Sequence, residues 1–181
     1  MIIIVNDASI LIDLMKIDLS DEFFRLPFEM HTTNLGSGEV IDENALRFQQ
    51  YIKKKKIQIW SFSDEEFEEV LKIKSDNPPL SMADCSCFWL CRQLSGTLLT
   101  SDGRLRRSAS EKDIPVHGIL WVFDQLILQK DITVWGAHRK LKVLMEINPR
   151  LPREECEKRL KKWNSKMEET ENGNKRCFWV Q

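Results

Sequence analysis

A carboxylate, Asp7, interrupts the otherwise apolar segment IIIVNDASILIDL at residues 2–14. Burying an unpaired charge is costly, so a partner is expected for this group. Glu39, Asp84 and Asp102 also lie just beyond predicted strands or in the first turns of predicted helices. Four carboxylates crowded in one crevice repel one another, and Mg²⁺ or Mn²⁺ relieves that repulsion because these ions prefer oxygen ligands. An ion held in this way can activate water and neutralise a phosphodiester, so the acids indicate metal-assisted hydrolysis.

Each of these acids also has a purely structural explanation. Asp7 and Asp102 could cap the helices that follow them, and Glu39 could complement a helix dipole. Asp84 could close a capping box with Ser81, although its neighbours at helical spacing are apolar and aim its charge toward the protein interior. If the central strands are neighbours, as in the common doubly wound orders, all four side chains can converge at one edge of the sheet, which favours one shared site over four separate structural roles.

The elements that would position these acids alternate between short apolar runs and helical patterns. Strands are predicted at 2–5, 29–34, 57–60, 97–100 and 114–118. Strands that alternate with helices form right-handed crossovers, so the predicted class is α/β: a three-layer α/β/α sandwich around a central, mostly parallel sheet of about five strands. Sites in such sheets form beyond the carboxyl ends of the strands, where Asp7 and Asp102 stand.

Helical patterns occupy most of the remaining chain. They predict helices at 8–16, 21–26, 36–56, 63–75, 81–94, 104–112, 119–130, 132–147 and 153–166. Ser37 is a candidate cap of the helix at 36–56, whose first turns are acidic and whose last turn is basic. Ser63 and Glu66 form a predicted capping box.

Composition and length set the remaining limits. The 181 residues, 42% apolar and 30% charged, are typical of one soluble domain, and the net charge of −1 does not indicate nucleic-acid binding. No apolar run reaches about 18 residues and the N-terminus lacks the features of a secretory signal, so we expect a cytoplasmic protein without a membrane span. Residues 131–181 contain no predicted strand, which divides the chain into an α/β domain at 1–130 and a helical extension packed on it, with a polar tail from about residue 168.

Other reactive side chains carry weaker indications. Cys85, Cys87 and Cys91 have the spacing of neither a disulfide framework nor a zinc module, and we interpret them as reduced, partly buried thiols. The three histidines are scattered without a nucleophile nearby in the sequence, which argues against a His-based hydrolase. Basic clusters at 53–56 and 157–162 are typical of solvated helix ends.

Four acidic segments together resemble the PIN-domain nucleases. VNDASILIDL, TTNLGSGEV, LSMADCS and LLTSDGRLRRSA match that family's segments in order, over roughly residues 1–130. The trailing helices, with INPRLPREECEKRLKKW, also resemble the tail of prokaryotic PIN proteins related to VapC toxins. The resemblance implies a metal-dependent endoribonuclease that uses Mg²⁺ or Mn²⁺ and leaves a 5′-phosphate. It also suggests the toxin of a toxin–antitoxin pair, with a small antitoxin protein as partner.

Carried over to this sequence, the resemblance assigns the catalytic and metal-binding acids as Asp7, Glu39, Asp84 and Asp102. Ser9 would be an accessory residue that orients Asp7 or a metal-bound water. Thr100 and Ser101 would support Asp102 or the scissile phosphate.

RNA must approach a crevice that is itself negative. Arg104, Arg106 and Arg107 are the best candidates for phosphate contacts, and a helix would turn Arg104 and Arg107 to one face. Most tryptophans lie in apolar patterns typical of a core. Trp179 in the tail is the exception and is a candidate contact for a partner or a second subunit, which leaves a homodimer open.

Several alternatives stay open. Asp42 and Glu43 are close enough in sequence to replace Glu39 as a ligand. A haloacid-dehalogenase-type phosphatase would need a second acid where Ser9 stands. A receiver domain would need an acidic pair before its phosphorylated aspartate and a lysine after the fifth strand, and the sequence has neither at those places. The stronger alternative is a PIN-like fold that acts as a catalytically weak or inactive binding or scaffold module.

Overall fold

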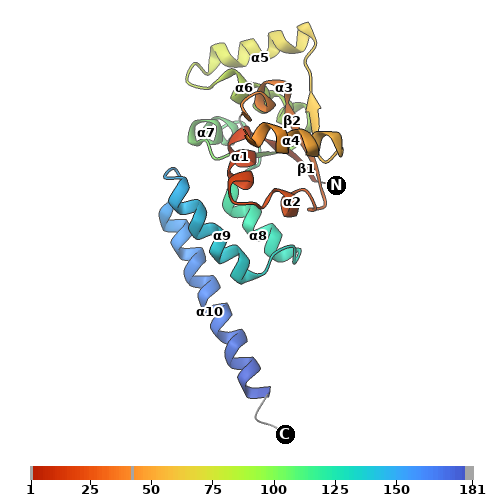
Figure 1. The fold of residues 1–181 in the computed structure, drawn as a ribbon. Helices are drawn as coiled ribbons and strands as arrows, with labels where there is room; N and C mark the ends of the chain where they lie inside the picture. The colour runs from red at the N-terminus through yellow and green to blue at the C-terminus, as the bar shows by residue number, and fades with distance from the viewer. Residues whose placement is uncertain (1, 42, 178–181) are drawn as a thin grey trace.

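The computed structural model describes residues 2–41 and 43–177 of the chain (Figure 1). Within these residues, five parallel strands form one sheet in the order β3-β2-β1-β4-β5. The strands are β1 (Ile2–Asn6), β2 (Phe28–Thr33), β3 (Gln58–Trp60), β4 (Thr97–Leu99) and β5 (Val116–His117). The predicted α/β fold class is confirmed, and each predicted strand has a counterpart in the sheet.

β1 occupies the centre of the sheet because its residues are apolar on both faces. Ile4 and Val5 are both fully buried and belong to different apolar clusters, as expected for neighbouring residues of a strand. The chain runs outward from β1 through β2 to β3 and then returns to place β4 on the other side of β1. This reversal sets the carboxyl ends of β1 and β4 side by side, at the point where α/β sheets bind ligands.

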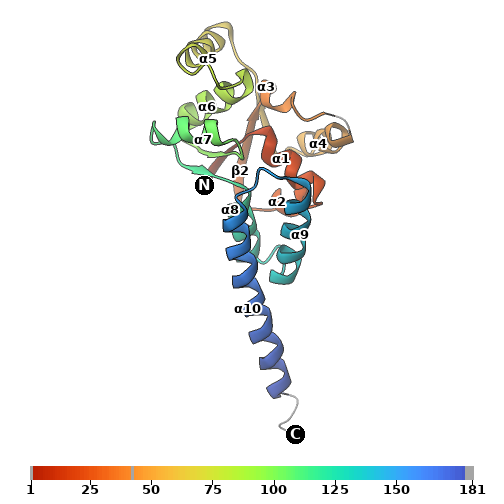
Figure 2. The ribbon, with the colours of Figure 1, turned by 90° about the vertical axis from the view of Figure 1, so that its left-hand side faces the viewer.

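Helices cover both faces of the sheet and complete the three-layer sandwich (Figure 2). Their bounds are α1 (Ala8–Lys16), α2 (Ser20–Phe23), α4 (Glu43–Lys53), α5 (Asp64–Asp76), α6 (Met82–Leu94), α7 (Gly103–Ser110), α8 (Ile119–Leu128), α9 (Val134–Ile147) and α10 (Arg153–Cys177). α1, α2, α4, α8, α9 and α10 contribute to the apolar cluster that contains Ile4 and Leu99. α5, α6 and α7 pack in the cluster that contains Val5 and Leu98, on the opposite face.

The prediction of one helix over 36–56 is wrong, because two helices occupy this part of the chain. Thr33 begins α3 (Asn34–Ser37) early, since its Oγ1 accepts a hydrogen bond from the N–H three residues further on. Ser37 therefore ends a helix and does not cap one, and the glycines on both sides of it are poor helix formers. Glu39 lies between α3 and α4 and not in a first helical turn. The predicted capping box at the start of α5 is confirmed.

The two C-terminal helices pack on the α/β domain through the larger apolar cluster. Leu141, Cys156 and Trp163 are buried in it, and the Trp163 ring centroid lies 6.0 Å from that of Phe123 in α8. α10 continues beyond its predicted end at Lys166 and projects away from the sheet in both views (Figures 1 and 2).

The division of the chain at residues 130 and 131 stays a prediction. The predicted polar tail is helical as far as Cys177, and its apolar tip, with Trp179, lies outside the described residues. In the described part of the chain, no helix combines the length and the apolar character needed to cross a bilayer.

Candidate active site

The four predicted acids line one cavity of about 1010 Å³, which we call the acidic cavity. Asp7 directly follows β1, and Asp102 lies after β4 at the start of α7. Asp84 stands in the first turn of α6, and Glu39 stands in the segment between α3 and α4. The reversal of strand order thus brings together acids that are far apart in the sequence.

Asp7 is the most deeply buried of the four acids, with 4% of its surface exposed. It occupies the N-cap position of α1, but its side chain makes no capping hydrogen bond. Its Oδ2 instead accepts hydrogen bonds from Ser9 Oγ at 2.6 Å and from Thr100 Oγ1 at 2.7 Å. Burial raises the pKa of Asp7, as does the charge of Asp84, whereas hydrogen bonds from Ser9 and Thr100 lower it. The side-chain hydrogen bonds of this carboxylate thus come mainly from hydroxyl groups and not from the helix N-terminus.

The same two hydroxyl groups connect Asp7 to the turn between β4 and α7. Thr100 Oγ1 accepts a hydrogen bond from the Asp102 N–H at 2.9 Å, and Ser9 Oγ accepts one from the Ser101 N–H at 3.1 Å. Each hydroxyl donates to Asp7 and accepts from the turn, so the orientation of Asp7 is tied to the position of Asp102. Ser101 Oγ is buried and has no hydrogen-bond partner among the described residues.

Asp84 and Asp102 do cap helices, each with one carboxylate oxygen. Asp84 Oδ2 accepts from the Ser81 N–H at 2.7 Å in a capping box, and Asp102 Oδ1 accepts from the N–H groups of Arg104 and Leu105. No hydrogen bond from a described residue reaches the second oxygen of either group. Asp84 is half-buried at the acidic cavity, not aimed into the apolar core. A carboxylate has two oxygens, so capping leaves each acid able to bind a further ligand.

Glu39 lies exposed at the edge of the acidic cavity. Its pKa is raised by partial burial and by the charges of Asp7 and Asp84, so these three groups repel one another when ionised. Of the alternatives to Glu39, Asp42 lies outside the described residues, and Glu43 begins α4.

The donor set of the acidic cavity fits a hard divalent cation by its chemistry. All four groups are carboxylates, the charges of Asp7, Glu39 and Asp84 repel one another, and no basic side chain is ion-paired with any of the four in the described part of the chain. As the side chains stand, however, no three His, Cys, Asp or Glu residues among those described are close enough to hold one ion. Binding therefore requires these side chains to turn toward a shared ion.

Basic side chains and a C-terminal loop complete the wall of the acidic cavity. Lys16, Arg104 and Arg150 line it, whereas Arg107 lies outside and lines a neighbouring cavity. The loop between α9 and α10 is held there because Asn148 Nδ2 donates to Asp13 Oδ2 on α1 at 2.8 Å. Neither this loop nor its arginine was part of the site predicted from the sequence, and the only signal was an Asn-Pro pair between two helices.

The buried charge of Asp7 leads to a prediction about stability. The folded state holds the Asp7 proton more tightly than the unfolded state, so this group stabilises the fold at acidic pH and loses that contribution as pH rises through its raised pKa. At neutral pH in EDTA, Asp7→Asn is therefore expected to raise the melting temperature. A gain of about 1 kcal/mol would raise it by roughly 2–4 °C.

Calorimetry at several pH values, with EDTA and with Mg²⁺, tests this expectation. The advantage of Asp7→Asn should shrink toward acidic pH, and Mg²⁺ should stabilise the wild type more than the variant. A variant less stable than the wild type at neutral pH in EDTA would contradict the assignment of Asp7 as a buried charge whose cost its hydrogen bonds do not fully offset.

Comparisons with protein-family models and with solved structures show which proteins the chain is similar to. A family model described as a PIN domain (DUF3368) matches residues 3–165, and no curated protein matches the sequence. Among solved structures, PAE2754 from Pyrobaculum aerophilum is 14% identical, with a TM-score of 0.49 over 70% of this chain and 98% of that one. VapBC-1 from nontypeable Haemophilus influenzae is 14% identical, with a TM-score of 0.47 over 66% and 99% of the two chains. VapBC2 from Rickettsia felis, in a structure with a DNA fragment from the promoter, is 9% identical, with a TM-score of 0.47 over 65% of this chain and 98% of that one.

The family match extends over most of the chain and includes both C-terminal helices up to residue 165. It spans every strand of the parallel sheet and all four acids of the acidic cavity. The chain therefore belongs to the PIN-domain family, a family of nucleases.

Proposed function

We propose that this protein is a metal-dependent endoribonuclease that hydrolyses RNA phosphodiester bonds at the acidic cavity with Mg²⁺ or Mn²⁺. The observation that carries the proposal is the buried carboxylate of Asp7, which shares its cavity with three further acids. A neutral side chain would fill this place at a lower cost to stability. A bound cation explains why a charged group stands there.

The acids and their neighbours have distinct proposed roles. Asp7, Glu39, Asp84 and Asp102 would hold the cation, which when bound would activate water and neutralise charge on the phosphodiester. Ser9 and Thr100 hold Oδ2 of Asp7 in one orientation. Ser101 Oγ, buried without a described partner at the cavity wall, is positioned to contact the scissile phosphate.

The basic residues of the acidic cavity would counter its negative charge as RNA approaches. Arg104→Gln is expected to weaken RNA binding and to reduce the slope of log K against log salt by about 0.7, because one phosphate contact is lost. Fluorescence anisotropy with labelled single-stranded RNA at several salt concentrations measures both effects. Arg107→Gln is the matched comparison, because Arg107 lies outside the acidic cavity. If Arg107→Gln weakened RNA binding more than Arg104→Gln does, the RNA would not bind along the acidic cavity as proposed.

Incubation with mixed RNA tests the proposed activity directly. Wild-type protein with Mn²⁺ or Mg²⁺ should cleave RNA internally, EDTA should abolish cleavage, and Asp7→Asn purified in the same way should be inactive. If inhibitor-free protein cleaves no RNA with either metal, the non-catalytic binding or scaffold module becomes the better interpretation.

A toxin–antitoxin role and a homodimer stay predictions. Expression that arrests growth, and that a small co-expressed neighbouring protein relieves, would support the toxin role. Harmless overexpression of active nuclease would count against it.

A further inference from the structure

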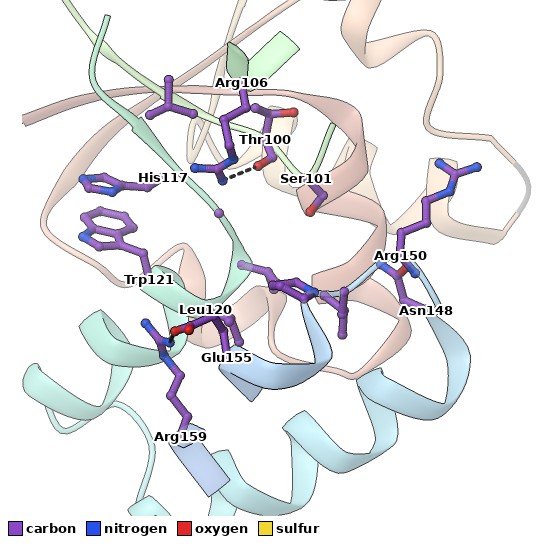
Figure 3. A pocket seen from close by; sticks show the side chains of 15 residues that line it. Thr100, Ser101, Arg106, His117, Leu120, Trp121, Asn148, Arg150, Glu155 and Arg159 are labelled. Carbon is purple, nitrogen blue, oxygen red and sulfur yellow. Dashed lines mark hydrogen bonds and ion pairs between the residues drawn. The ribbon is translucent and has the colours of Figure 1, made fainter. Parts of the chain in front are cut away.

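A second cavity, of about 400 Å³, lies directly beside the acidic cavity. Ser101, Asn148 and Arg150 line both cavities, so the two adjoin at these residues. The second cavity is enclosed by β5, the start of α8 and the loop that leads into α10 (Figure 3). None of the four acids of the proposed metal site lines it.

The second cavity is positively charged. Its charged lining residues are Arg106, Arg150, Arg159 and one acid, Glu155. Glu155 is already paired with Lys158 at 2.8 Å and with Arg159 at 3.6 Å, and Arg159 is also paired with Asp124 at 2.9 Å. The positive charge available to a ligand is therefore that of Arg106 and Arg150. Arg106 donates from Nη2 to the Thr100 carbonyl at 3.2 Å and forms no ion pair within the described part of the chain. A cation that is half-buried without a carboxylate partner attracts an anionic ligand.

One end of the second cavity is aromatic. The rings of His117 and Trp121 stack with centroids 4.4 Å apart and planes 5° from parallel, and Trp121 also stacks on Phe28 at 5.5 Å. The face of His117 that is turned away from Trp121 is therefore the one on which a base could stack. Figure 3 shows this pair and Arg150 at opposite ends, with the Arg106 guanidinium between His117 and Thr100. Burial lowers the pKa of His117, and the charge of Arg106 lowers it further, so both favour the neutral ring. A cavity with an aromatic end and a cationic end is complementary to the base and the phosphate of a nucleotide.

Two polar atoms in the wall lack partners. Ser101 Oγ and Arg159 Nε are both buried, and neither makes a hydrogen bond to any described residue. Unpaired buried polar atoms are costly, and most in native proteins have a partner or contact a ligand or water. The donors and acceptors of a nucleotide would supply the missing partners.

We propose that the second cavity binds one unpaired nucleotide of the RNA substrate, next to the phosphate that is cleaved. The base occupies the end formed by His117, Trp121 and Arg106, and its phosphate lies at Arg150, where the two cavities meet. This inference rests on the proposed ribonuclease function and adds a base-binding subsite to it. A paired base cannot enter such a cavity without leaving its helix, so the protein would select single-stranded RNA.

Binding measured without cleavage tests the subsite. Full-length Asp7→Asn protein in EDTA is titrated into fluorescein-labelled hexaadenylate, hexauridylate and a duplex of the same length, with anisotropy as the readout. Two variants alter the cavity in different ways. Arg106→Gln removes the guanidinium, and Gly118→Val keeps every charge but places a Cβ 2.7 Å from Arg106 Nη2, which must move. Arg92→Gln, an exposed arginine on α6 that lines neither cavity, is the control with the same change of charge.

We expect both cavity variants to weaken binding of at least one hexanucleotide by roughly 5-fold to 100-fold, the range for losing one stacked base, while Arg92→Gln changes it little. AMP or UMP should compete with the RNA better than inorganic phosphate does. Melting curves establish that each variant is folded. If only one of the two cavity variants is folded, its binding data are enough to test the subsite.

If single strands bind but the cavity variants behave like the control, or if the duplex binds equally well, the subsite is wrong and the nuclease proposal stands. If inorganic phosphate competes as well as the nucleotides, the cavity does not bind the base and the inference fails. If no RNA binds at all, the RNA substrate and the subsite both fail.

Discussion

Asp7→Asn is expected to lower RNA cleavage by more than about 100-fold, which exceeds the 10–100-fold typical of losing a residue that only orients a metal ligand. Asparagine keeps the shape of the side chain, and its carbonyl oxygen can still accept the hydrogen bonds of Ser9 and Thr100. It loses the negative charge that would hold a divalent cation. Single-turnover cleavage of labelled RNA at saturating Mn²⁺ measures the loss.

A matched aspartate separates the role of Asp7 from a general effect of charge. Asp113→Asn changes an exposed residue in a left-handed turn with φ 56°, a conformation that asparagine accepts as readily as aspartate. Its cleavage rate should equal that of the wild type. Undiminished cleavage by pure Asp7→Asn protein would overturn the placement of the reaction at the acidic cavity.

Thr100→Val is expected to lower the cleavage rate by about 10–100-fold, because Thr100 orients a proposed metal ligand. Valine has the size of threonine, but it can neither donate to Asp7 Oδ2 nor accept from the Asp102 N–H. The loss of these hydrogen bonds should also lower the free energy of unfolding by about 1–3 kcal/mol. The rate constant for cleavage should fall more than the affinity for RNA, since Thr100 acts through Asp7.

Thr100→Ser distinguishes positioning from packing. Serine keeps the hydroxyl and loses a methyl group in a fully buried place, so it should restore most of the cleavage rate while remaining less stable than the wild type. Equal cleavage rates for the valine and serine variants would show that the hydroxyl has no role in the reaction.

Much of the fold was predictable because its signals are local. The segments that become β1, β2, β3 and β4 are strands at nearly their predicted places, and the α/β alternation correctly implied a parallel, three-layer sandwich. Asp7 and Asp102 follow the central pair of strands, so their meeting could be inferred from the general rule for such sheets. The break between α3 and α4 is not predicted, because the charge pattern of 36–56 favours one helix more strongly than its two glycines disfavour it. In the structure Thr33 caps α3, so this helix begins before residue 36.

The details of the site depended on contacts between distant residues. From sequence, helix capping and a place in the site are competing explanations for Asp84 and Asp102, but in the folded chain each carboxylate caps with one oxygen and also lines the acidic cavity. Arg106 and Arg107 are neighbours in sequence, yet they line different cavities, Arg106 the second cavity and Arg107 the one near Pro79. The direction of each side chain followed from packing of α7 against β5, which the residue types alone do not specify.

Residue types and their spacing alone determined the layered α/β class, the four acids and their oxygen-donor chemistry. Strand and helix periodicity and ligand preference are properties of short segments, so they can be recognised in the sequence. The burial of Asp7 between two hydroxyls, the Arg150 loop in the wall and the second cavity arose only when the chain folded. These features depend on how β4 pairs with β1 and how the C-terminal helices pack on α1 and α8, and such long-range contacts leave no local pattern in a single sequence.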